Sequence, residues 1–147
     1  MLLKLAGVLS ALVALLHVAI VLVGPRAYRY FGAGERMAQL AEKGFPGPAL
    51  LTLALTMVFA MWSAYAFSGA GLLRRLPLLR PALVAIGSIY TVRGLILGPQ
   101  LIWFFTGDRD AVPLRHIVFS AVSLVTGLAY LIGAKAVWAQ LGGKNRG

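Results

Sequence analysis

Four long apolar runs dominate the chain and constrain what it can fold into. They cover residues 5–23, 49–68, 82–105 and 117–139, with glycine or proline beside each of the first three. A helix needs about 20 apolar residues to cross a hydrocarbon layer about 30 Å thick, and helices satisfy their backbone groups internally there. The sequence therefore predicts an all-α integral membrane protein, with residues 1–147 forming a single domain built as a four-transmembrane-helix bundle.

The composition agrees with a membrane protein rather than a soluble domain. Hydrophobic residues make up 60% of the chain and charged residues only 12%, whereas about 25% charged residues is usual in soluble domains. The net charge of +10 would suggest nucleic acid as a partner of a soluble protein. Here the cations lie in short connections between apolar runs, so we expect membrane lipids as partners and no nucleic acid. The absence of cysteine excludes disulfides and thiolate chemistry, and no pattern predicts a metal or a cofactor.

The first run could be confused with a secretory signal peptide. Its length exceeds the usual signal core of about 7 to 15 residues. Gly24, Pro25 and Arg26 follow it in place of a small-x-small cleavage site. We expect this run to be a retained helix.

The basic residues of the connections predict an orientation in the membrane. Four spans place both termini and the connection 69–80 on one side, which carries Lys and Arg but no acid, whereas all four acids lie on the other side. The two sides are nearly equal in the number of Lys plus Arg residues. The orientation is therefore predicted from the high density of arginine in the short central connection. We predict cytoplasmic N- and C-termini, and the bias toward Ala, Leu, Gly and Arg indicates a bacterial inner membrane.

Residues 34–43, between the first two runs, fit a short amphipathic helix. Met37, Leu40 and Ala41 fall on one side of it, the charged residues lie elsewhere, and Gly44 is a natural helix stop. We expect this helix to lie at the membrane interface, to cap the bundle and to lower Glu35 toward its interior.

Arg93 stands near the middle of the third apolar run, whereas every acid lies outside the runs. An unpaired charge inside a membrane span costs roughly 2.5 kcal/mol or more, so it usually has a partner or a use. At about 3.6 residues per turn, Tyr90, Leu97 and Gln100 share its face. We therefore expect Arg93 to point into an interior cavity or toward a partner rather than into lipid.

Stripes of small residues indicate which other faces pack together. On the third run, a separate face suited to close packing holds Gly87, Thr91, Gly94 and Gly98. On the fourth run, the face predicted to be interior holds Ser120, Ser123, Gly127, Tyr130 and Ala134.

Three alternatives remain open for Arg93. It could form a structural pair with Glu35, bind an anionic ligand, or contact another protein. His17, the one histidine within a run, could supply a hydrogen bond or a titratable proton to such a ligand, or it could be a neutral histidine bonded to a hydroxyl across the bundle. The candidate ligand-binding or buried polar cluster is Arg93, Tyr90, His17, Glu35 and Gln100.

The leading functional hypothesis is a small non-enzymatic membrane protein that binds a lipid-like or anionic ligand, or a partner helix, around Arg93. One alternative is a membrane enzyme acting on a lipid or hydrophobic substrate, with His17 or Glu35 as acid or base and Arg93 holding an anion. Another is a subunit of a homo-oligomeric transporter or channel. The expected partners are membrane lipids and either further copies of the chain or another membrane protein.

Overall fold

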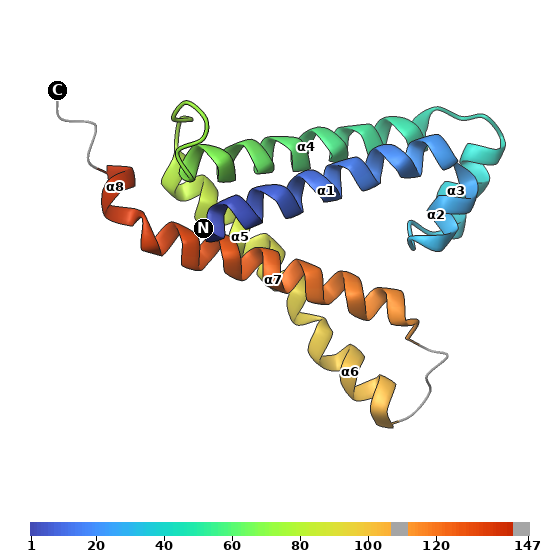
Figure 1. The fold of residues 1–147 in the computed structure, drawn as a ribbon. Coiled ribbons are helices and arrows are strands. Elements are labelled where there is room, and N and C mark those ends of the chain that lie inside the picture. The colour runs from blue at the N-terminus through green and yellow to red at the C-terminus, as the bar shows by residue number, and fades with distance from the viewer. Residues whose placement is uncertain (107–111, 143–147) are drawn as a thin grey trace. The chain divides into compact units, whose positions relative to one another are not determined.

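The computed structural model describes residues 1–106 and 112–142, and these residues form helices and turns with no strand. The helices, drawn in Figure 1, are α1 (Leu2–Val23), α2 (Pro25–Tyr30), α3 (Glu35–Glu42), α4 (Gly47–Gly69), α5 (Leu79–Leu95), α6 (Leu97–Thr106), α7 (Leu114–Ala136) and α8 (Trp138–Gly142). The prediction of an all-helical protein is confirmed for this part of the chain.

Four helical segments are long and apolar enough to cross a membrane. They are α1, α4, the combined stretch Leu79–Thr106 of α5 and α6, and α7. Each coincides with one of the four predicted runs to within a few residues. The fourth helix ends at Ala136, three residues before the predicted end at residue 139.

The chain divides into two compact units, and the division passes through α1 and α4. The first unit comprises Met1–Gly7 and Ala64–Gly147, and the second comprises Val8–Ser63. Arg93, Tyr90 and Gln100 belong to the first unit, whereas His17 and Glu35 belong to the second.

Glycines bring α5 and α7 into close contact in the first unit. A Cβ atom added to Gly94 would lie 2.5 Å from both Cα and N of Leu124 on α7. A Cβ atom on Gly127 would meet Thr91 and would lie 2.8 Å from the carbonyl oxygen of Gly87. The two backbones therefore approach each other as they do in close-packed membrane helices.

The predicted faces of these helices are largely correct. Ser120, Gly127, Tyr130 and Ala134 of the α7 stripe are buried, and Gly87 and Gly94 of the α5 stripe are buried as well. Thr91 and Ser123 are half-buried, whereas Gly98 is exposed and nothing lies within 4 Å of a Cβ atom placed there.

The third span is broken near its middle, and the break explains why Gly98 lies apart. Helix α5 ends at Leu95 and α6 begins at Leu97. Pro99 has no N–H to donate to the carbonyl of Leu95, and its ring clashes with that carbonyl. Beyond the break α6 diverges from α7 (Figure 1) and buries none of its residues. The third span, predicted over 82–105, is therefore present as Leu79–Thr106 but is interrupted at Ile96.

The second unit holds a small apolar core beneath α2 and α3. Gly24, with a positive φ of 76°, turns the chain out of α1, and Pro25 opens α2. The core consists of Ile20, Ala27, Tyr28 and Ala38, flanked by Leu16, Phe31 and Ala41. Helix α3 lies within the range predicted for an amphipathic helix, and Ala38 is its buried residue.

Candidate functional site

Arg93 lies on α5, two residues before its end, and its side chain reaches Ser120 of α7. The guanidinium Nη1 donates one hydrogen bond to the Ser120 hydroxyl at 3.3 Å. Ser120 is fully buried, whereas Arg93 is exposed. A guanidinium carries five N–H donors, so one long bond to a neutral oxygen leaves most of them without a partner among the described residues.

Tyr90 and Gln100 do not extend the Arg93 face as a continuous helix would require. Tyr90 is buried, and its ring stacks on Tyr130 of α7 with the ring centres 5.9 Å apart. Gln100 lies on α6, beyond the break, where its side-chain Oε1 is buried without a hydrogen-bond donor in the described part of the chain. The break therefore divides the predicted polar face. Tyr90, before the break, packs against α7, whereas the buried oxygen of Gln100, after the break, lacks a hydrogen bond among the described residues.

His17 is held within the second unit by its own helix. Its Nδ1 donates to the carbonyl oxygen of Val13 at 2.8 Å, one turn earlier on α1. The imidazole ring lies against Phe59 of α4, with ring centres 4.8 Å apart. Nδ1 is thus bonded to a backbone carbonyl, and a bond from His17 to a hydroxyl across the bundle stays a prediction.

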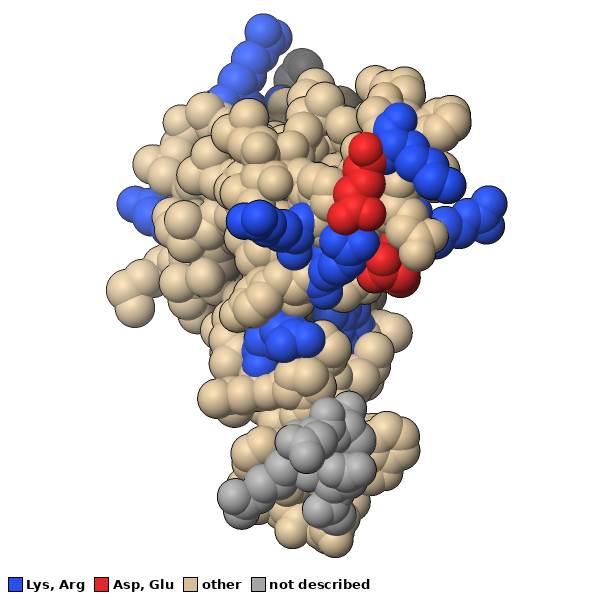
Figure 2. Space-filling view, turned by 90° about the vertical axis from the view of Figure 1, so that its right-hand side faces the viewer, with Lys and Arg blue, Asp and Glu red and all other residues tan. Residues whose placement is uncertain are grey.

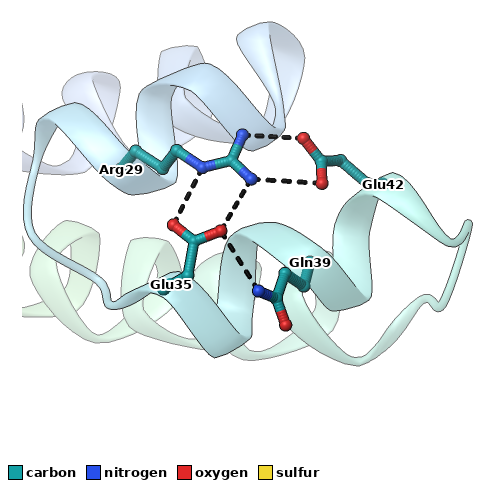
Figure 3. Close-up of polar contacts among 4 residues, drawn as sticks. All are labelled: Arg29, Glu35, Gln39 and Glu42. Atoms are coloured by element: carbon teal, nitrogen blue, oxygen red, sulfur yellow. Dashed lines mark hydrogen bonds and ion pairs between the residues drawn. The ribbon is translucent and has the colours of Figure 1, made fainter.

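Glu35 forms part of a clamp in which one arginine binds two carboxylates (Figure 3). Arg29 Nε and Nη2 donate to the two oxygens of Glu35 at 2.9 and 2.8 Å, and Nη1 and Nη2 donate to those of Glu42 at 2.7 and 3.1 Å. Gln39 adds a 3.3 Å bond to Glu35. The clamp links α2 to α3. The pairing of Glu35 with Arg93 would join different units and stays a prediction.

The clamp sets the ionisation of both acids. Hydrogen bonds from Arg29 lower the pKa of Glu35 and of Glu42 below the usual 4.5. The same bonds, first to Glu35 and then to Glu42, raise the pKa of Arg29. All three groups are therefore charged at neutral pH.

Acidification is expected to loosen α3 from α2. Because the folded-state pKa values of Glu35 and Glu42 are lowered, the clamp's contribution to stability is complete above about 4.5 and disappears as the pH falls through those lowered values. Amide hydrogen exchange of residues 35–42, corrected for the intrinsic rate, should accelerate in this window. The E35Q/E42Q variant should exchange rapidly already at neutral pH, and equal protection of α3 in both proteins at every pH would contradict the clamp.

Sequence reasoning missed Arg29 as the partner of Glu35. The signal was the spacing, because Arg29 precedes Glu35 by six residues and Glu42 by thirteen. A tight turn between two short helices can bring such residues together. Gly34, with a φ of 97°, provides a backbone conformation that this turn needs and that other residues rarely adopt.

Within the described residues, no group of three or more His, Cys, Asp or Glu is placed to hold a metal ion. The chain matches no family model, no curated protein and no solved structure.

Proposed function

We propose that the chain is a non-enzymatic integral membrane protein whose α5 surface binds the anionic group of a lipid-like molecule through Arg93. In this proposal the four long apolar helices cross a bacterial inner membrane as a bundle, with both termini in the cytoplasm. Helix α3 lies at the membrane interface. The site on α5 then lies within the apolar layer.

The state of Arg93 is the observation that supports the proposal most strongly. It is an exposed cation in the middle of the span Leu79–Thr106, and it has one 3.3 Å bond to a neutral hydroxyl. Glu35 and Glu42 are the acids of the described chain, and all four of their carboxylate oxygens already accept hydrogen bonds from Arg29. A charge in lipid needs compensation, and an anion from outside the chain would supply it.

The surroundings of Arg93 favour an amphiphile over a free ion. Ile89, Val92 and Ile96 lie three or four residues from one another along this face of the span, and they are 52, 67 and 48% exposed. An alkyl chain can lie along these side chains while its phosphate or carboxylate meets the planar guanidinium fork, whose geometry matches such groups. The ligand class is therefore an anion with an apolar tail.

The other hypotheses have less support. A partner helix carrying a carboxylate would satisfy Arg93 by the same chemistry, and the experiment below distinguishes it from a lipid. No observation on the described residues favours the membrane enzyme or the transporter subunit, and both stay predictions.

Replacing Arg93 should remove the bound amphiphile. A hydrogen bond to a charged group contributes about 1.5 to 3 kcal/mol, so Arg93→Leu should lower the retained anionic lipid about tenfold or more. Arg93→Lys keeps the positive charge but lacks the planar guanidinium, so it should retain an intermediate amount of anionic lipid. Native mass spectrometry of protein purified in mild detergent measures the retained lipid directly.

Arg74→Leu is the matched control, because Arg74 is also exposed but lies outside the four spans. It should retain lipid as the wild type does. Undiminished lipid in Arg93→Leu would refute the proposal. A lipid-free wild-type oligomer that dissociates in Arg93→Leu would also refute it, and would establish the partner helix instead.

A further inference from the structure

The segment between α1 and α4 carries charges that the Arg29 clamp does not neutralise. Both acids of the segment are bound to Arg29. Arg26, Arg36 and Lys43 are exposed and have no partner among the described residues. In Figure 2 the acidic side chains lie against a basic one. The clamp thus leaves three cations free to meet an anion from outside.

Two aromatic side chains accompany these cations. Tyr30, at the end of α2, is 55% exposed, and Phe45, three residues after α3, is 57% exposed. The rings of Tyr30 and Phe31 form a T-shaped pair, and Phe31 packs on the core beneath the two helices. Exposed aromatic rings next to cations are typical of the level of lipid headgroups.

Packing and hydrogen bonds hold α2 and α3 in place. Ala38 of α3 is fully buried against the core. The hydroxyls of Thr52 on α4 and Tyr28 on α2 are hydrogen-bonded at 3.4 Å, and the Arg29 clamp joins α2 to α3. The segment's position along the chain is equally informative, because one residue separates α1 from α2 and four residues separate α3 from α4. Two long apolar helices thus flank it directly.

We infer that the exposed side chains Arg26, Tyr30, Arg36, Lys43 and Phe45 of the segment between α1 and α4, together termed here the headgroup face, dock on the anionic headgroups of a phospholipid membrane. The three cations contact lipid phosphates and acidic headgroups, and the two aromatic rings enter the interface. The clamp keeps both glutamates bound to Arg29, so that they do not engage these cations. This inference assumes the membrane insertion proposed above but does not depend on the site at Arg93.

The absence of cysteine from the chain allows a direct test. Ala33, exposed in the turn between α2 and α3, is replaced by cysteine in the full-length chain and labelled with a fluorophore. The protein is reconstituted into vesicles of phosphatidylcholine and phosphatidylglycerol, with quenching bromine atoms on the chains of one lipid or of the other. The ratio of the two quenching efficiencies gives the local enrichment of the anionic lipid.

We expect phosphatidylglycerol to be enriched around the label, with up to about fivefold preference for each cation at low salt. The R26Q/R36Q/K43Q variant should lose most of this enrichment. The control K4Q/R74Q/K135Q removes the same charge at exposed residues outside the headgroup face and should behave as the wild type. High salt should weaken the enrichment, because charges at a surface are screened.

Three outcomes would overturn the inference. Equal enrichment in the wild type and in R26Q/R36Q/K43Q would show that the headgroup face does not select the lipid. Loss of enrichment in both triple variants would show an effect of net charge alone. Lack of quenching by either lipid would place α3 away from the membrane and would refute the proposed membrane insertion as well.

Discussion

Replacing Gly94 with alanine is expected to push α5 away from α7 and to lower the free energy of unfolding by about 2 to 3 kcal/mol. The added methyl group would lie 2.5 Å from the backbone of Leu124. No side-chain rotation can relieve a clash with a backbone, so the two helices must separate. The interface would then lose the contacts made by Gly87, Thr91 and Gly127 as well.

Gly98→Ala is the matched control on the other side of the helix break. A Cβ atom there has nothing within 4 Å, and alanine is the better helix former, so stability should stay the same or rise slightly. Reversible unfolding in mild detergent by titration with a denaturing detergent, followed by helical circular dichroism, measures both variants. Equal midpoints for Gly94→Ala and the wild type would refute the close contact of α5 with α7.

Leu83→Ala is expected to cost about 2 kcal/mol through the cavity that it leaves. Leu83 is fully buried in the first unit, and its Cδ1 would lie 2.9 Å from a Cβ atom on Gly69, the last residue of α4. Lipid tails are as apolar as leucine, so a membrane helix gains little from burial as such. The lost packing contacts therefore account for most of the expected cost.

Leu95→Ala tests this argument with the same change of side chain. Leu95 ends α5 and is 60% exposed, so its truncation opens no cavity. The same detergent titration should show a midpoint close to that of the wild type for Leu95→Ala and a clear decrease for Leu83→Ala. Similar losses in the two variants would mean that the burial of Leu83 contributes nothing specific.

The elements predicted from the sequence were those that depend on local pattern. Four runs of apolar length gave four long helices, and the spacing of Met37, Leu40 and Ala41 gave α3. The small-residue faces of α5 and α7 also pack as expected, since glycine is the residue that permits close approach of backbones. Length and periodicity are sufficient for such features.

The break between α5 and α6 was not predicted, although Pro99 was visible in the sequence. Membrane helices tolerate proline when their neighbours satisfy the freed backbone groups, so its presence alone does not fix where a helix ends. The divergence of α6 from α7 depends on tertiary packing that a single span does not encode. Tyr90 and Gln100 are separated for that reason.

The partners of the charged residues could not be predicted from the sequence either. The Arg29 clamp depends on the turn between α2 and α3, which places one guanidinium between two carboxylates thirteen and six residues away. Arg93 lies within the candidate span Leu79–Thr106, but its bond to Ser120 crosses between helices. Sequence spacing identifies candidate charges, whereas their pairing follows from the packed structure.

The nuclear magnetic resonance signal of the Arg93 guanidinium tests the central proposal most directly. In protein labelled with isotopic arginine and held in neutral micelles, the Nε–Hε signal of Arg93 is the one missing from the Arg93→Lys variant. Addition of a long-chain alkyl phosphate should shift this signal until it saturates, while inorganic phosphate at the same concentration should not move it. An Arg93 signal that does not shift on addition of the alkyl phosphate, or that shifts equally with both anions, would contradict a lipid-like anion site on α5.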